Sequence, residues 1–99
     1  MPEMTFAVRW PDGTTQQCYS PSLVMHDHLA VGATYTVSDF RERSTTALTE
    51  AAERVRAKFG FACTSAAATA AEIIATADRH PDTASVEILS MTPPLPRRP

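Results

Sequence analysis

The sequence has too few cysteines for the framework that holds small secreted domains together, because its 99 residues include two, Cys18 and Cys63. Two cysteines are too few for a set of disulfides, and their distant positions match no zinc-finger spacing. The start MPEMTFAVRW has neither the basic nor the apolar segment of a signal peptide. We therefore expect a cytoplasmic protein with reduced thiols.

An excess of charge and long apolar runs are also missing. The 9 basic and 11 acidic residues give a formal net charge of −2, which argues against nucleic acid as a partner. No apolar run approaches the roughly 18 residues of a membrane span, so no membrane partner is expected. Phosphate-binding glycine loops, zinc-protease motifs and serine-hydrolase motifs are absent too. A chain of this length fits one small domain with a modest core.

The first structural pattern along the sequence is that of a β-hairpin. Apolar and polar side chains alternate over residues 5–10, as in a strand with one buried face. A Pro-Asp-Gly turn signal follows, and residues 14–19 return as a second strand. Cys18 and Tyr19 are then expected on opposite faces of that strand.

The pair Ser20-Pro21 has the chemistry of a helix start. Serine can cap a helix, and proline fits the first helical position because its missing N–H would have no partner there. We therefore predict a short helix or helical turn over 20–29, with Ser20 as its N-cap. Residues 33–37 are expected to be extended.

The strongest helical pattern follows Ser38, the expected N-cap, and Asp39, whose charge suits the helix dipole. The charged face of this helix, which lies opposite its apolar face, places Glu50 four residues before Arg54. This is the spacing of a weak ion pair. Gly60 suits the C-terminal end. One face carries apolar residues at helical spacing, with Ser44 as the polar exception: Phe40, Leu48, Ala51, Ala52, Val55 and Phe59.

An alanine-rich helix is predicted over 66–79 and a third strand over 84–91. The proline-rich stretch TPPLPRRP, residues 92–99, is expected to be a disordered tail. This order predicts an α+β fold: a small two-layer sandwich in which an N-terminal hairpin, a short helix, two longer helices and a C-terminal strand form one domain over 1–91.

The reactive side chains allow more than one interpretation. Cys18 and Cys63 each precede a predicted helix start, where the helix dipole would lower a thiol pKa. Cysteine is also a common small core residue, so ordinary packing explains both positions as well. His26 and His28 are two residues apart and would point in different directions on a helix. We therefore predict no metal site and no cofactor.

Three stretches carry a family resemblance: MPEMTFAVRWPDG, CYSPS and ALTEAAERVRAKFGFACTSA. Their order and spacing resemble the nitrogen starvation response proteins of actinobacteria and cyanobacteria, over most of residues 1–75. Members of this family are encoded with a nitrilase, a radical-SAM protein, an acetyltransferase and a flavin-dependent oxidoreductase. Such clusters are associated with nitrogen limitation and with the use of cyanide or nitriles. The resemblance therefore implies a pathway but no reaction.

The resemblance also implies which residues to test. The family pattern falls on residues 9–13, on 18–22 and on several positions within 54–63. From the last two stretches come the candidate binding residues: Cys18, Tyr19, Ser20, Ser22, Arg54, Arg56 and Cys63.

Two functions follow from these observations. The first is a non-enzymatic accessory protein of a nitrogen-starvation, nitrile- or cyanide-related pathway, which binds an enzyme of the pathway, itself or a small metabolite. The second is a thiol-dependent enzyme or carrier in which Cys63 or Cys18 adds to a nitrile carbon. The small core and the alanine-rich helix favour a homo-oligomer. A DNA-binding regulator is disfavoured by the acidic balance of charge.

Overall fold

The computed structural model describes residues 3–60 and 64–93 of the chain. Cys63 and residues 94–99 of the predicted tail lie outside the described residues. The α+β class and the predicted order of elements are confirmed. The elements are β1 (Met4–Arg9), β2 (Thr15–Ser20), the 3-10 helix η1 (Leu23–Asp27), β3 (Thr34–Thr36), α1 (Val37–Phe59), α2 (Thr64–Ala77) and β4 (Ser85–Thr92).

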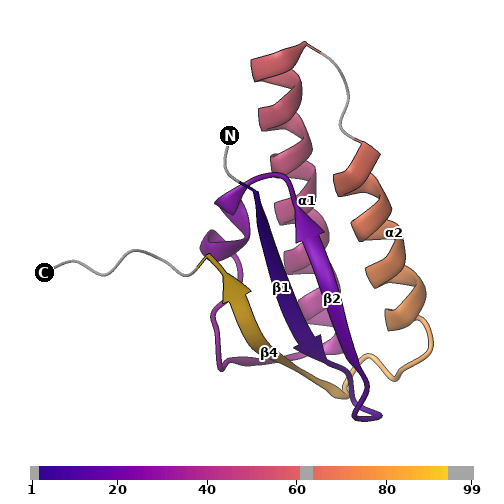
Figure 1. The fold of residues 1–99 in the computed structure, drawn as a ribbon. Coiled ribbons are helices and arrows are strands. Elements are labelled where there is room, and N and C mark those ends of the chain that lie inside the picture. The colour runs from indigo at the N-terminus through magenta and orange to yellow at the C-terminus, as the bar shows by residue number, and fades with distance from the viewer. Residues whose placement is uncertain (1–2, 61–63, 94–99) are drawn as a thin grey trace, which may run out of the picture.

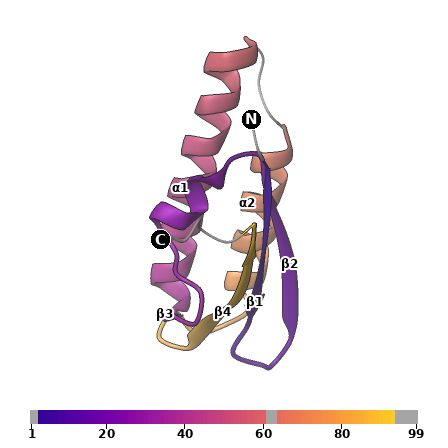
Figure 2. The ribbon, with the colours of Figure 1, turned by 60° about the vertical axis from the view of Figure 1, so that its left-hand side comes forward.

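The strands form one antiparallel sheet in the order β2-β1-β4-β3. The C-terminal strand β4 lies between β1 and β3, and the hairpin turn joins β1 to β2 (Figures 1 and 2). Both long helices cover the same face of this sheet, and the opposite face carries no helix within the described residues (Figures 1 and 2). The predicted arrangement of helices on one face is therefore confirmed.

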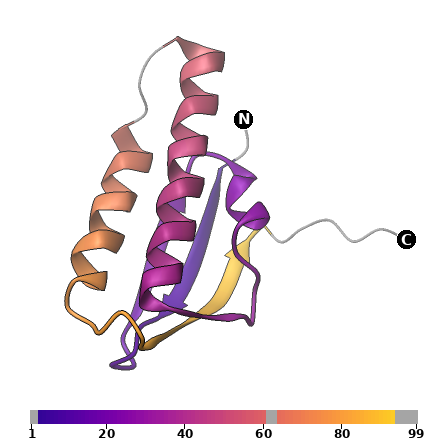
Figure 3. The ribbon, with the colours of Figure 1, turned by 180° about the vertical axis from the view of Figure 1, so that it is seen from behind.

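The core lies between the sheet and the helices, which Figure 3 shows from the helix side. Alternation along β1 directs Met4, Phe6 and Val8 inwards, as the sequence pattern predicts. Ser44 is buried in the apolar stripe of α1 because its hydroxyl donates to the carbonyl oxygen of Phe40 at 2.7 Å. The facing residues are small or aliphatic: Ala47, Leu48 and Ala51 of α1, Ala66, Ile73 and Ala77 of α2, and Val86 and Ile88 of β4.

Phe59 was predicted to join this core, and the structure corrects that prediction. The residue is 50% exposed at the C-terminal end of α1. Helical spacing places it on the expected stripe, but the last turns of α1 extend beyond the sheet (Figure 1). A residue on the apolar face of a helix is covered only where another layer reaches it.

The N-cap predicted at Ser20 is wrong. Ser20 is the last residue of β2 and pairs with Met4 across the sheet. The helical residues begin at Leu23, and Ser22 is the cap, because its hydroxyl accepts a hydrogen bond from the N–H of Val24 at 3.3 Å. The strand ladder holds Ser20 extended, so the helical turn begins only after the chain leaves the sheet.

The N-cap predicted at Ser38 is also wrong. α1 begins at Val37, and the hydroxyl of Thr36 accepts a hydrogen bond from the N–H of Asp39 at 3.1 Å. The N–H groups of Val37 and Ser38 donate to backbone carbonyls of the loop before β4, at 2.8 and 3.2 Å. Because that loop supplies acceptors for them, the helix starts directly after β3 rather than at Asp39.

The remaining boundaries shift by one or two residues. α2 covers Thr64–Ala77 where 66–79 was predicted, and β4 covers Ser85–Thr92 where 84–91 was predicted. Within the described residues, neither helix has both the length and the apolar composition needed to cross a bilayer.

Candidate ligand pocket on the open sheet face

A hollow forms where β1 leaves the sheet. The pairing of β1 with β4 ends at Arg9 and Glu87. The next residue, Trp10, turns into the hairpin, where its N–H donates to the carbonyl oxygen of Thr14 at 2.8 Å. β4 continues in the other direction to Ser85, still paired with β3. One side of β4 is therefore left without its neighbouring strand over its first residues.

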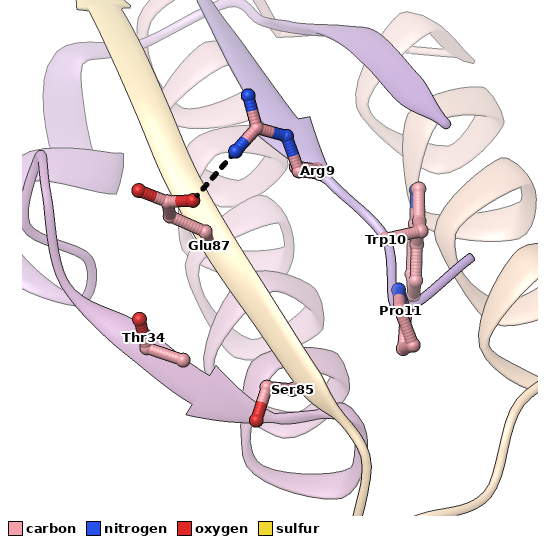
Figure 4. Close-up of a pocket in the computed structure, with 6 residues that line it drawn as sticks. All are labelled: Arg9, Trp10, Pro11, Thr34, Ser85 and Glu87. Carbon is pink, nitrogen blue, oxygen red and sulfur yellow. Dashed lines mark hydrogen bonds and ion pairs between the residues drawn. The ribbon is translucent and has the colours of Figure 1, made fainter. Parts of the chain in front are cut away.

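This hollow is a pocket of about 300 Å³, which Figure 4 shows in close-up. The guanidinium of Arg9 and the carboxylate of Glu87 point toward each other, with Arg9 Nη1 at 3.1 Å from Glu87 Oε1. The two side chains are 52% and 43% exposed, so the pair is open to solvent and to a ligand. The wall consists of charged, hydroxyl and ring side chains: Arg9, Trp10, Pro11, Thr34, Ser85 and Glu87.

The tryptophan side of the pocket is rigid. Trp10 is 2% exposed, and its indole N–H donates to the side-chain oxygen of Gln16 at 2.8 Å. Its ring meets Phe40 edge-on at 5.5 Å and stacks on His80 at 5.6 Å, measured between ring centroids. Contacts on several sides fix the indole before any ligand arrives, so this wall is preformed.

The adjoining turn is held by local hydrogen bonds. The carboxylate of Asp12 accepts from the hydroxyl of Thr14 at 2.7 Å and from its backbone N–H at 3.1 Å. These two hydrogen bonds lower the pKa of Asp12 below its usual value, and the bond from the Thr14 hydroxyl contributes most. Gly13 has a φ of +88°, which glycine adopts without strain. The turn therefore fixes the direction in which Pro11 enters the pocket wall.

A second, smaller cavity of about 150 Å³ lies between α1 and α2. Its lining contains no charged side chain within the described residues: Leu48, Thr49, Ala52, Ala66, Ala67 and Ala70. A charged group helps to fix the orientation of a small polar ligand, and these lining residues offer none. The pocket beside Trp10 is therefore the better candidate site.

Cys18, one of the residues predicted from the sequence, lies in the core. It is 2% exposed on the helix-facing side of β2. Burial raises the pKa of its thiol to about 12, and the negative charge of Glu72 contributes in the same direction. A thiol with this pKa is protonated at neutral pH, which weakens the case for Cys18 as a nucleophile.

The next predicted binding residues along the chain lie in two different environments: Tyr19 in one, and Ser20 and Ser22 in the other. Tyr19 points to the other face of the sheet from Cys18, and its hydroxyl donates to Glu3 Oε2 at 2.8 Å. Ser20 and Ser22 are buried together: the hydroxyl of Ser20 donates to the carbonyl oxygen of Ser22 at 2.8 Å. The two serines therefore form a buried turn and not an open site.

Arg54 and Arg56 lie on the exposed side of α1. Arg54 Nη2 is 3.9 Å from Glu50 Oε2, so the predicted i,i+4 pair is present. The carbonyl oxygen of Arg56 accepts the N–H of Gly60 at the end of the helix. Cys63, the last of the predicted binding residues, lies outside the described part of the chain.

The two histidines weighed as metal ligands turn to different partners. His26 Nε2 is 2.9 Å from the carbonyl oxygen of Pro93, and His28 Nε2 is 3.3 Å from Glu50 Oε1. Within residues 3–60 and 64–93, no three cysteine, histidine or acidic side chains are grouped so that they could hold a metal ion.

Thr34, Ser85 and Glu87 were not identified as site residues from the sequence. They line one pocket with Arg9 only because β4 pairs with both β1 and β3. Part of a signal was present, since the family resemblance includes residues 9–11, all of which line the pocket. Nothing in the sequence pattern linked them to a strand near the other end of the chain.

Fold and pocket together define a small α+β protein with a polar pocket on an open sheet face. The chain belongs to the family described as nitrogen starvation-induced protein NitG, whose model matches residues 5–91. This match confirms the predicted nitrogen-starvation family, and it spans every residue of the pocket wall. No curated protein and no solved structure matched the chain.

Proposed function

We propose that this protein is a non-enzymatic accessory protein of nitrogen starvation that binds a small, polar, nitrogen-containing metabolite in the pocket beside Trp10. The observation that carries the proposal is a half-exposed ion pair, Arg9 with Glu87, in a hollow whose edge is held in place by the buried and tightly packed Trp10. The volume of about 300 Å³ is at the lower end of the range for ligand pockets, which favours a small metabolite.

The cellular setting of the proposal comes from the family. A role in nitrogen starvation follows from membership of the NitG family. The nitrile- and cyanide-related pathway and an enzyme of that pathway as partner rest on the sequence resemblance, whereas the cytoplasmic location rests on the few cysteines and the missing signal-peptide pattern; all three are part of the proposal. A homo-oligomer is part of the proposal as well, and light scattering on the purified protein measures its mass directly.

Trp10 provides the assay, because it is the single tryptophan of the chain and lines the pocket. Its fluorescence would be titrated with free amino acids, urea, small carboxamides, acetonitrile, cyanide and small carboxylates. We expect at least one nitrogen compound to change the emission in a saturable way. Calorimetry on the same compound gives an independent dissociation constant.

Arg9→Gln and Arg54→Gln form a matched pair of variants. Each arginine is 52% exposed and each lies beside a glutamate that is 43% exposed. We expect Arg9→Gln to weaken binding by about tenfold or more and Arg54→Gln to leave it unchanged. Loss of binding in Arg54→Gln alone would move the site to the α1 surface, and no saturable signal for any compound would overturn the proposal.

The thiol-dependent function now depends on Cys63. Cys18 is buried and its thiol pKa is raised to about 12, so it is a poor nucleophile. Labelling of Cys63 with iodoacetamide at pH 7, in a Cys18→Ala variant, tests that alternative. A labelling rate no higher than that of an unfolded thiol would count against it.

A further inference from the structure

We infer that the ligand of this pocket is a small zwitterion, a molecule that carries a carboxylate and a protonated amine a few bonds apart, as a free amino acid does. The inference rests on the proposed function and adds the charge pattern of the metabolite. It follows from the two charged side chains that face the hollow, Arg9 and Glu87, and from the hydrogen bond that already joins them.

The positive half of the site is Arg9. A guanidinium has five N–H donors in a planar fork that matches a carboxylate. The contact with Glu87 Oε1, at 3.1 Å through Nη1, engages one edge of that fork. With the side chain 52% exposed, the remaining donors are accessible to a second carboxylate.

The negative half is Glu87. A carboxylate has two oxygens and several acceptor positions, and the contact with Arg9 engages Oε1. The second oxygen is directed away from Arg9 in Figure 4, on the side of β4 that faces β3. A protonated amine placed there would pair with Glu87 while its carboxylate pairs with Arg9.

The combination selects against ligands of one charge. A simple anion that reaches Arg9 also meets the like charge of Glu87, and a simple cation that reaches Glu87 meets Arg9. A zwitterion satisfies both groups at once. Thr34 and Ser85 line the same pocket and offer hydroxyls that can donate or accept.

The rest of the wall suits the carbon part of such a molecule. The rings of Trp10 and Pro11 lie on the side of the pocket away from Glu87 (Figure 4), and because Trp10 is 2% exposed, the exposed Pro11 supplies most of the apolar surface there. The indole is fixed by Phe40, His80 and Gln16, so its surface needs no rearrangement on binding. Side chains of modest size fit a volume of about 300 Å³.

The test uses glycine, L-alanine, L-serine and L-glutamine, each in three forms: the free zwitterion, the N-acetyl derivative and the carboxamide. Acetylation removes the positive charge and amidation removes the negative one. Trp10 fluorescence and calorimetry on the full-length protein give the dissociation constants. We expect at least one free amino acid to bind more tightly than both of its derivatives by about tenfold or more, because each derivative loses a charge-assisted hydrogen bond.

Two variants assign the charges to residues. Glu87→Gln should reduce the preference for the free amino acid over its N-acetyl form, whereas Arg9→Gln should reduce the preference over the carboxamide. Arg41→Gln, which removes an exposed arginine that pairs with Asp78 at 3.4 Å, should keep both preferences. This pattern would assign the ammonium group to Glu87 and the carboxylate to Arg9, and equal effects of Glu87→Gln on both preferences would contradict the assignment.

The outcomes also separate this inference from the proposed function. If N-acetyl derivatives or plain carboxylates bind as well as free amino acids, the site is an anion site and the zwitterion inference is wrong. If no amino acid binds but urea, a carboxamide or a nitrile does, the proposed function stands and the inference fails. If nothing binds, both fail.

Discussion

The buried thiol of Cys18 leads to a prediction that can be worked out from the structure. Burial, with a smaller contribution from Glu72, raises its pKa from 9.0 to about 12. At pH 8, about one tenth of a thiol with a pKa of 9.0 is thiolate, whereas with a pKa of 12 the fraction is about one in ten thousand. Because alkylating reagents react with the thiolate, the folded protein should label about a thousandfold more slowly than the unfolded chain.

The assay is iodoacetamide labelling of a Cys63→Ser variant, in which Cys18 is the one remaining cysteine, followed by mass spectrometry. The same variant unfolded in guanidinium chloride supplies the reference rate. The labelling rate of the folded protein should continue to rise above pH 10, because its thiol is still mostly protonated there. A folded rate within about tenfold of the unfolded rate at pH 8, with a midpoint near pH 9, would refute the assignment of Cys18 to the core.

The same pKa shift links Cys18 to stability. Below pH 9 the thiol is protonated in both states and adds no dependence on pH. As the pH rises above 9.0, the thiol ionises in the unfolded chain first, so the free energy of unfolding falls by about 1.4 kcal/mol per pH unit. The fall ends near pH 12, where the folded thiol also ionises. Cys18→Ala protein should lack this component, and denaturation series of both proteins from pH 8 to 10 would measure the difference.

Three further predictions concern stability, each measured by urea denaturation. Thr36→Ala should lower the free energy of unfolding by about 1 kcal/mol because it removes the N-cap of α1. Ser38→Ala should change it by less than about 0.5 kcal/mol. A larger loss for Ser38→Ala than for Thr36→Ala would show that Ser38 is the cap. Phe40→Ala should cost about 3–5 kcal/mol, since the ring is fully buried against Trp10, and a loss below about 1 kcal/mol would contradict that packing. Gly60→Ala should cost about 1 kcal/mol because the residue has a φ of +77°, and no loss would argue against a left-handed cap.

The parts of the fold that the sequence predicts well are those with a local cause. Alternation over residues 5–10 specifies a strand with one buried face wherever that strand is placed. Helical spacing of apolar residues specifies α1 in the same way, and Ser44 could enter the stripe because its own helix accepts its hydrogen bond. The class, the order of elements and the two-layer arrangement could therefore be predicted before the structure was known.

The parts that were predicted wrongly depend on contacts between distant segments. Ser20 has the chemistry of a cap, but pairing with β1 keeps it in a strand. Ser38 has it too, but the loop before β4 supplies acceptors for the helix start and moves the cap to Thr36. Phe59 follows the helical period, but α1 is longer than the sheet it covers. In each case the local signal was correct and the tertiary environment decided the outcome.

Two ion pairs show why the ligand pocket could not be found from the sequence. Glu50 and Arg54 are four residues apart on one helix, so their pairing could be predicted from spacing alone. Arg9 and Glu87 are 78 residues apart, and only the position of β4 beside β1 joins them.

The two ion pairs also show why exposure alone does not identify a site. Both have the same exposed fractions, 52% and 43%, and half-exposed pairs of this kind contribute at most about 1 kcal/mol to stability. Their surroundings differ: the pair on α1 lies on a convex helix surface, whereas the pair on the sheet lies in a hollow beside the fixed ring of Trp10. Under the proposed function, the charges of Arg9 and Glu87 hold a ligand because they lie within that concave surround, so the matched glutamine variants at Arg9 and Arg54 should unfold alike yet bind differently.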